Sequence, residues 1–424
     1  MDVELTDDQE LLRETTASFL DRTCPVSTVR EWSEKEPAGF PDAWWQQGAA
    51  LGWTSLLVSE ADGGGSVSGH GLLDLTLVAE EMGRRVSPGP LLPTNVVAAA
   101  LSEYGTAEQR ARYLPGILSG EAIATWCLGE VGSSGLPGAI SLEATPHGEG
   151  FVLSGRKGAT QAAAESDLFV VAALVGGEPT QFLVDADAPG VSVVPAEALD
   201  LTHRFGFVEF DQVALAPDAV LGAVGGAGEQ IERLFELAVA LQCASMAGAI
   251  DRILAVTIEY SFDRFSFGRP LASYQALKHR FADMKLWTEA SLATAGAAAH
   301  AVDSRSDKAY ELVSVAKSYI GDHAPAILSD CVQLHGGIGV TWDHDLHLYT
   351  RRVVEDRSLF GTPEEHRERI ADIESFRARA RAWLAANMPL LAGQNNFQLM
   401  LQDEMGTRAR ELQRILFDGG FAGL

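Results

Sequence analysis

The hydrophobic periodicity of this chain changes twice along its length, and this change most constrains its fold. Over residues 5–118 apolar residues recur every three or four positions, as in amphipathic helices interrupted by Gly and Pro. Between residues 122 and 225 short β-rich runs separated by turn residues replace this pattern. From residue 228 long amphipathic segments return. This order predicts helices, then a small β-barrel or sandwich, then a helical bundle.

The expected domain boundaries follow these changes. Residues 1–121 form an N-terminal α-helical domain, 122–226 a middle β-barrel or sandwich domain, and 227–372 a C-terminal four-helix bundle. In residues 373–424 two blocks, ESFRARARAWLAANMP and RELQRILFDGGFAGL, resemble LLRETTASFLDRTCP and DAWWQQGAALGWTSL near the N-terminus, in the same order. This helical extension is therefore either an ordinary pair of amphipathic helices or the start of a second copy of the fold.

Composition narrows the classes of protein and partner. The chain has 424 residues, of which 46% are hydrophobic and 21% charged, enough for several buried cores. Its formal net charge of -26 would repel phosphate backbones and anionic lipids, so we expect neither nucleic acid nor a membrane as partner. The N-terminus is acidic where a signal peptide would be basic. These features predict a soluble, multidomain, cytoplasmic protein.

The cysteines give no sign of a disulfide framework or a metal site. They are widely separated, form no CxxC pair and have no histidine cluster at metal-ligand spacing. We therefore expect no metal, and reduced, mostly buried thiols at Cys24, Cys127, Cys243 and Cys331.

Two motifs in the bundle suggest a ligand. Arg264, Phe267 and Gly268 stand together in DRFSFG, ahead of Gln275 and His279. A guanidinium offers forked donors that suit pyrophosphate or ribose oxygens, and the aromatic ring beside it can pack on a dinucleotide. The same residues also suit an ordinary helix end, closed by Gly with Arg on the helix dipole.

The second motif combines polar side chains with glycines that let a backbone approach a ligand closely. It comprises Gln333, His335, Gly336, Gly337 and Gly339. A Gly-Gly pair after a helix is also an ordinary helix terminator, so this motif alone does not decide between a ligand site and a helix end.

Five blocks together resemble the acyl-CoA dehydrogenase family, whose order they follow over residues 1 to 370. They are LGWTSLLVSEADGGG, VAEEMGR, GTAEQRARYLPGILSGE, DRFSFGRPLASYQALKHRFADM and QLHGGIGVTWDHDLHLYTRR. The resemblance implies that family's fold, FAD as cofactor, an acyl-CoA thioester as substrate and an electron-transfer acceptor as partner. The implied setting is fatty acid or steroid side-chain β-oxidation, in which a carboxylate removes the α-proton while flavin accepts a hydride from the β-carbon.

The resemblance also implies an oligomer. In this family both bundle motifs reach across a subunit interface to the adenine and pyrophosphate of a neighbour's FAD. We therefore expect a homo- or hetero-oligomer of acyl-CoA dehydrogenase-like subunits, in which the cofactor-binding residues of this chain are Arg264, Phe267, Gln275, Gln333, Gly336 and Gly337.

The catalytic base of the family has no match in this sequence. Where relatives have Tyr-Glu-Gly-Thr, this chain reads Leu359, Phe360, Gly361 and Thr362. The alternative position for the base, on the first long bundle helix, is Ala238. No catalytic residue is assigned, and helical spacing predicts solvent-facing positions for the nearby acids Glu232, Glu236, Glu355 and Asp356.

The β domain departs from the family as well. Gly129 stands where the family has the Thr that meets the isoalloxazine ring, and Gly158 and Ala159 replace a Trp-Ile pair that packs on it. The elements lost are those that serve the chain's own flavin, whereas those offered to a neighbour remain. We therefore expect a half that completes a partner's FAD site. The alternatives are a self-sufficient dehydrogenase with an unorthodox base and a non-catalytic dimerisation scaffold.

Overall fold

The computed structural model describes residues 5–371. The chain divides into a unit formed by Met1–Arg367 and a second unit, Glu368–Leu424. The expected extension at residues 373–424, with its possible second copy of the fold, lies outside the described residues. The elements described below belong to the first unit, apart from the last residues of α11.

The N-terminal part is helical, as expected. Thr6 and Thr106 each cap the N-terminus of a helix. The threonine hydroxyl accepts a hydrogen bond from the backbone N–H of the glutamine three residues later, and the glutamine side chain accepts one from the threonine backbone N–H. Trp45 and Trp53 are fully buried among these helices. The elements are α1 (Asp7–Thr23), α2 (Val26–Lys35), α3 (Asp42–Ala50), η1 (Glu60–Asp62), α4 (Gly71–Arg84), α5 (Leu91–Tyr104) and α6 (Ala107–Ser119).

The middle part is a pair of four-stranded sheets, which confirms the β domain. One sheet has the order β1 (Ala124–Cys127), β4 (Leu168–Val175), β5 (Glu178–Asp185) and β8 (Val220–Leu221). The other has the order β2 (Ala144–His147), β3 (Gly150–Gln161), β7 (Phe205–Leu215) and β6 (Val191–Ala196). All neighbouring strands are antiparallel except β1 and β4, which are parallel.

Strand β4 is apolar at nearly every position because both of its faces are buried. Phe169 and Val171 point into the core between the two sheets. Leu168 and Val170, on the other face, belong to the core shared with the helices. The first sheet therefore joins the β domain to the helical part.

The C-terminal part is built on long helices, in agreement with the expected bundle. Helix α7 (Gly228–Asp263) has the length and apolar composition of a membrane-spanning helix, but 72% of its most apolar window is buried inside the protein, as in a core helix. A short β-hairpin, with strands of two residues each, and a single turn of 3-10 helix connect α7 to α8. The remaining elements are β9 (Phe265–Ser266), β10 (Arg269–Pro270), η4 (Leu271–Ser273), α8 (Gln275–Asp303), α9 (Ala309–His335), η5 (Gly336–Val340), α10 (Leu346–Ser358) and α11 (Pro363–Ile370).

Two glycines let α4 and α7 pack with their backbones in contact. A Cβ on Gly83 would lie 2.0 Å from the Ser245 carbonyl oxygen, and a Cβ on Gly248 would lie 2.2 Å from the Glu80 carbonyl oxygen. Any larger residue would separate the helices. This contact fixes the N-terminal helical part on the bundle.

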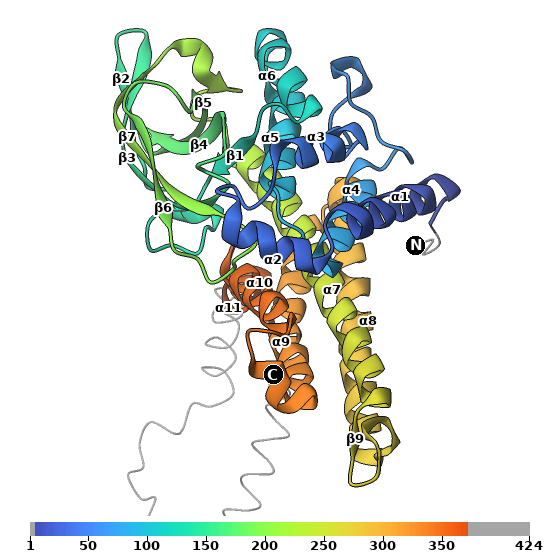
Figure 1. The fold of residues 1–424 in the computed structure, drawn as a ribbon. Coiled ribbons are helices and arrows are strands. Elements are labelled where there is room, and N and C mark those ends of the chain that lie inside the picture. The colour runs from blue at the N-terminus through green and yellow to red at the C-terminus, as the bar shows by residue number, and fades with distance from the viewer. Residues whose placement is uncertain (1–4, 372–424) are drawn as a thin grey trace, which may run out of the picture. The chain divides into compact units, whose positions relative to one another are not determined.

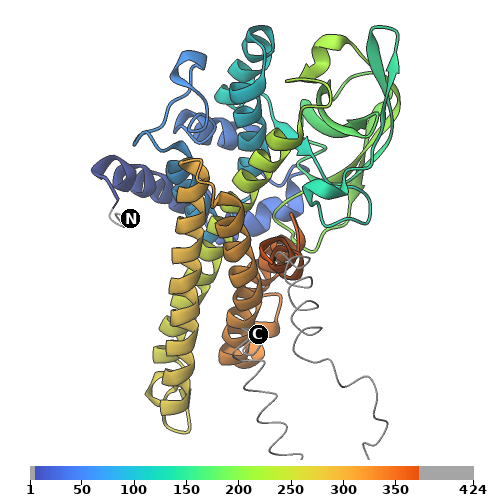
Figure 2. The same ribbon diagram turned by 180° about the vertical axis from the view of Figure 1, so that it is seen from behind.

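The two ends of α7 have different surroundings. Its N-terminal end is tied to β5, because the Ala227 amide donates to the Pro179 carbonyl at 3.0 Å. Its C-terminal end, with β9, forms a protruding tip of the bundle, on the side away from the sheets (Figures 1 and 2). The four cysteines are buried free thiols, as expected.

Candidate functional site

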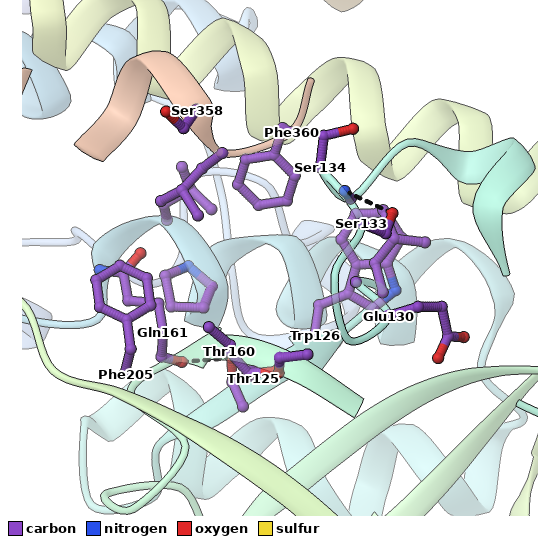
Figure 3. Close-up of a pocket in the computed structure, with 18 of the residues that line it drawn as sticks. Thr125, Trp126, Glu130, Ser133, Ser134, Thr160, Gln161, Phe205, Ser358 and Phe360 are labelled. Carbon is purple, nitrogen blue, oxygen red and sulfur yellow. Dashed lines mark hydrogen bonds between the residues drawn. The ribbon is translucent and has the colours of Figure 1, made fainter. Parts of the chain in front are cut away.

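An open pocket lies where α5, the sheets and the segment after α10 meet. It has an empty volume of about 730 Å³, counting its open mouth. Figure 3 shows Ser358 and Phe360 entering from the end of α10, with the strand residues on the opposite side. The lining includes Thr125, Trp126, Glu130, Ser133, Ser134, Thr160, Gln161, Phe205, Ser358 and Phe360.

Phe360 is held in place by its neighbours. Its ring stacks on Trp126, with centroids 6.5 Å apart, and meets Phe235 edge-on at 6.3 Å. Its carbonyl oxygen lies 2.8 Å from Nε2 of His366. With φ at 56° its backbone is left-handed, which is rare for a bulky residue and costs energy that these contacts offset. An apolar ring thus occupies the position at which the resemblance implies a base.

A buried ion pair shapes the turn that follows β1. Lys157 Nζ lies 2.5 Å from Glu130 Oε1 and donates to the Leu128 carbonyl at 3.2 Å. Burial lowers the pKa of Lys157, and Glu130 opposes that shift. A Cβ on Gly158 would lie 2.6 Å from the Glu130 carbonyl oxygen, so only glycine fits there. Gly129 and Ala159, which differ from the family pattern, both line the pocket.

The six expected cofactor residues lie elsewhere. None of them lines the pocket, and all are exposed. The structure brings their two motifs to the same end of the bundle, where the Tyr260 ring stacks on His335 with centroids 4.3 Å apart. Tyr260 is one helical turn before Arg264, and His335 directly precedes Gly336.

This end of the bundle fits a dinucleotide phosphate. Within residues 5–371 the Arg264 guanidinium has no hydrogen-bond or ion-pair partner. Its donors are therefore free to bind a phosphate group. Phe267 is 97% exposed and has a φ of 48°, so the chain presents a bare ring through a strained backbone. Gln275 lies 3.2 Å from His279, both on the exposed face of α8.

The tip and the pocket are far apart. Phe235, which contacts Phe360, is 29 residues before Arg264 on one unbroken helix. At 1.5 Å per residue this places roughly 40 Å between them. The tip residues of one chain therefore cannot reach a ligand in that chain's own pocket.

One of the acids expected to face solvent is buried, and for that residue the prediction was wrong. Asp356 is only 6% exposed. Gln242 Nε2 donates to Asp356 Oδ1 at 3.4 Å, and buried Lys317 donates to the Asp356 carbonyl at 2.5 Å and to the Gln242 side chain. Burial raises the pKa of Asp356 to about 7, although Arg352 opposes it. Helical spacing predicts that Asp356 faces solvent, but the packing of α10 against α7 and α9 buries it.

The other three acids are partly exposed, as expected. Glu355 accepts a hydrogen bond from the Leu199 amide at 2.9 Å, and Glu232 and Glu236 are half-buried on α7. None of them lines the pocket. Ala238 is fully buried.

Sequence reasoning missed a second buried ion pair, between the β domain and α10. Arg352 Nε donates to Asp200 Oδ2 at 2.6 Å, and Asp200 Oδ2 also lies 3.2 Å from His203 Nδ1. Asp200 and Arg352 are 152 positions apart, and only the i,i+4 spacing of Arg352 and Asp356 on α10 could have suggested a shared buried face.

A helical domain, a two-sheet domain and a long helical bundle around a pocket at their junction define an acyl-CoA dehydrogenase fold. Family models agree: one described as "Acyl-CoA dehydrogenase, N-terminal domain" matches residues 6–121, and "Acyl-CoA dehydrogenase, C-terminal domain" matches residues 226–374. The chain belongs to the acyl-CoA dehydrogenase family. Members of this family are generally FAD-dependent oxidoreductases, and solved homologues contain FAD or FADH2.

Three relatives narrow its place in the family. Acyl-CoA dehydrogenase IpdE2 of Mycolicibacterium smegmatis is 29% identical over 366 residues, which cover 86% of this chain and 98% of the relative. Acyl-CoA dehydrogenase FadE34 of Mycobacterium tuberculosis is 30% identical, over 82% of this chain but 45% of the relative. The ChsE4-ChsE5 complex of Mycobacterium tuberculosis contains a chain with a TM-score of 0.78 and 26% identity, covering 87% of this chain and 98% of that one.

Proposed function

We propose that this chain is one half of a two-part acyl-CoA dehydrogenase and completes the FAD site of a partner half that bears the catalytic base. The observation that supports this most is the separation of the tip from the pocket. Among residues 5–371 the Arg264 guanidinium at the tip has no partner and the Phe267 ring is exposed, whereas the pocket has Phe360 where the family's base would stand.

The residues at the tip would bind and orient the cofactor of the partner. Arg264 would hold the pyrophosphate by charge-assisted hydrogen bonds, with Gln275 and Gln333 as polar partners. Gly336 and Gly337 have open space where a Cβ would stand, which lets the backbone approach the ligand. When bound, FAD would supply the hydride acceptor for α,β-dehydrogenation of the acyl-CoA thioester.

Neither of the two positions at which the resemblance implies a base bears a proton acceptor in this chain. Phe360 has an apolar ring, and Ala238 is buried and has only a methyl group. Proton abstraction would then depend on a carboxylate of the partner half.

The relatives support a two-part enzyme. The ChsE4-ChsE5 structure is a complex of two components, ChsE4 and ChsE5. The match to FadE34 covers 45% of that protein, which leaves room for a second copy of the fold within it. This chain would therefore work beside another acyl-CoA dehydrogenase-like chain, or as the front half of a fused protein.

One observation favours the second candidate, a self-sufficient dehydrogenase with an unorthodox base. Asp356 is a buried carboxyl group whose pKa is raised to about 7, a value suited to a general base. It lines a second cavity rather than the pocket that contains Phe360. We rank this candidate second because the carboxyl already accepts from Gln242.

Flavin retention tests the leading proposal. Arg264→Ala should lower the affinity of the assembled pair for FAD about tenfold or more, because charge-assisted hydrogen bonds are lost. Arg13→Ala, a half-buried arginine on α1 with no ion pair among the described residues, is the matched control and should retain flavin. Unchanged flavin content in the Arg264 variant would refute the proposal. Flavin and turnover in the isolated chain would instead support the self-sufficient enzyme.

A further inference from the structure

A second cavity adjoins the main pocket on the bundle side. The two share Leu92 and Gln161, so Gln161 stands at their junction. The second cavity lies among α4, α5, α7 and α10, and several polar side chains stand among the apolar ones in its lining. The polar side chains that line it include Ser87, His203, Gln242, Ser245, Arg352 and Asp356.

Three of these polar side chains make few or no hydrogen bonds within the part of the chain that the structure describes. Ser87 is fully buried and, apart from a weak contact with the Cys24 thiol, its hydroxyl has no hydrogen-bond partner among the described residues. Over residues 5–371 the side chains of Gln161 and Ser245 make no hydrogen bond either. An unsatisfied buried polar group costs about 1–3 kcal/mol, so the buried Ser87 hydroxyl, with the half-buried side chains of Gln161 and Ser245 beside it, indicates a polar ligand.

The charged side chains that line the cavity already have partners in the protein. Arg352 is paired with Asp200, and Asp356 accepts a hydrogen bond from Gln242, whose side-chain oxygen accepts from Lys317. A carboxylate or an ammonium group entering the cavity would find no unpaired opposite charge and would lose its hydration. The cavity therefore suits an uncharged ligand group.

The protonation state of His203 indicates whether the ligand group should donate or accept a hydrogen bond. Burial and the neighbouring Arg352 lower the pKa of His203, which keeps the imidazole neutral. The Asp200 carboxylate can only accept, so Nδ1, 3.2 Å from it, carries the proton and Nε2 is left as an acceptor. Nε2 has no partner within residues 5–371, and a ligand hydroxyl could donate to it while accepting from a serine.

We propose that this cavity binds a hydroxyl group on the acyl part of an acyl-CoA thioester whose thioester end lies in the main pocket. This inference rests on the proposed function in one respect, that the ligand is an acyl-CoA thioester. It concerns binding by this chain and includes no chemical step. It would make the second cavity the determinant of acyl-group preference in this half.

Matched thioesters test the proposal. The full chain, purified in the assembly that it forms, is titrated calorimetrically with straight-chain acyl-CoA thioesters from butanoyl to dodecanoyl, each beside its (ω−1)-hydroxy and (ω−1)-keto counterparts. At the chain length that spans both cavities, the hydroxyl compound should bind about tenfold more tightly than the alkyl compound, and the keto compound should gain less. Equal affinities at every length, or no binding at all, would overturn the proposal.

Serine variants locate the effect. The double variant Ser87→Ala/Ser245→Ala should lose the hydroxyl preference while retaining alkyl-CoA binding, which also shows that the variant is folded. Ser141→Ala, an exposed serine outside both cavities, should retain the preference. If the double variant retained it too, the cavity would not be the site. Flavin retention, measured separately, reports on the proposed function and is not expected to change with these serines.

Discussion

Arg352 on α10 and Asp200 in the loop before β7 form an ion pair of 2.6 Å, with side chains 2% and 1% exposed. Arg352 Nη2 also donates to the backbone carbonyls of Val86 at 3.3 Å and Ser87 at 3.2 Å. One guanidinium therefore links the N-terminal helical part, the β domain and the helix that ends at the pocket. Its geometry holds α10, and with it Phe360, in position.

Breaking the ion pair between Arg352 and Asp200 should strongly destabilise the folded protein. Asp200→Asn leaves the buried Arg352 charge unpaired and should lower the free energy of unfolding by about 3–5 kcal/mol at pH 7. Asp345→Asn, which removes the half-exposed partner of Arg30 just before the same helix, should cost less than about 1 kcal/mol. Urea unfolding compares the two. Equal losses would contradict a special role for the buried pair.

The same pair should give a pH signature. Burial acts to raise the pKa of Asp200, but Arg352 and His203 outweigh it, so the folded pKa lies below the ordinary value. The carboxylate's contribution is thus present above about pH 4 and lost as pH falls through the folded pKa. The stability gap between wild type and Asp200→Asn should narrow below about pH 4. A gap that stayed constant on acidification would count against this assignment.

Asp356 should behave in the opposite sense. Because its folded pKa is raised to about 7, the folded state holds this proton more tightly than the unfolded state. Its contribution is full below about pH 4 and is lost as pH rises through about 7. Relative to wild type, Asp356→Asn should therefore be more stable at pH 8 than at pH 5, measured by thermal unfolding at both values.

The Asp356 variant also separates the two candidate functions. If the partner half supplies the base, Asp356→Asn should leave turnover by the assembled enzyme within about twofold. If Asp356 is the base, turnover should fall by a factor of about 100 or more, with flavin content unchanged. Steady-state kinetics with an artificial electron acceptor gives this measurement.

Phe360 should matter for packing rather than for chemistry. Phe360→Ala removes ring contacts with Trp126 and Phe235 and should lower stability by about 1–3 kcal/mol, less than a fully buried ring, because Phe360 is partly exposed. Turnover by the assembled pair should change by less than about threefold. Abolished turnover in a variant that remains folded and retains flavin would show that this pocket takes part in the reaction.

The glycine contact between α4 and α7 offers a matched pair of helical substitutions. Gly248→Ala places a Cβ 2.2 Å from the Glu80 carbonyl oxygen and should destabilise the protein by several kcal/mol, in the manner of an overpacked core. Gly296→Ala, on the exposed face of α8 with nothing within 4 Å, should stabilise it by up to about 1 kcal/mol through helix propensity. Thermal unfolding measures both, and a neutral Gly248→Ala would contradict the close packing.

Local pattern gave the elements of the fold. The periodicity of the helices, the apolar run of β4 and the Thr-x-x-Gln caps depend on neighbours a few residues away, so they can be recognised in the sequence. The motif residues Arg264 and Phe267 could also be singled out, since guanidinium and aromatic chemistry do not depend on the fold.

Only the tertiary structure decided which polar residues are buried and which sites are joined. Asp356 has the spacing of a surface residue, yet it is buried because Gln242 and Lys317, on helices far away in sequence, enclose it. The roughly 40 Å that separates the tip from the pocket follows from one unbroken helix. Burial and proximity depend on contacts between segments that are far apart in sequence. A sequence pattern reflects only near neighbours, so it does not show these contacts directly.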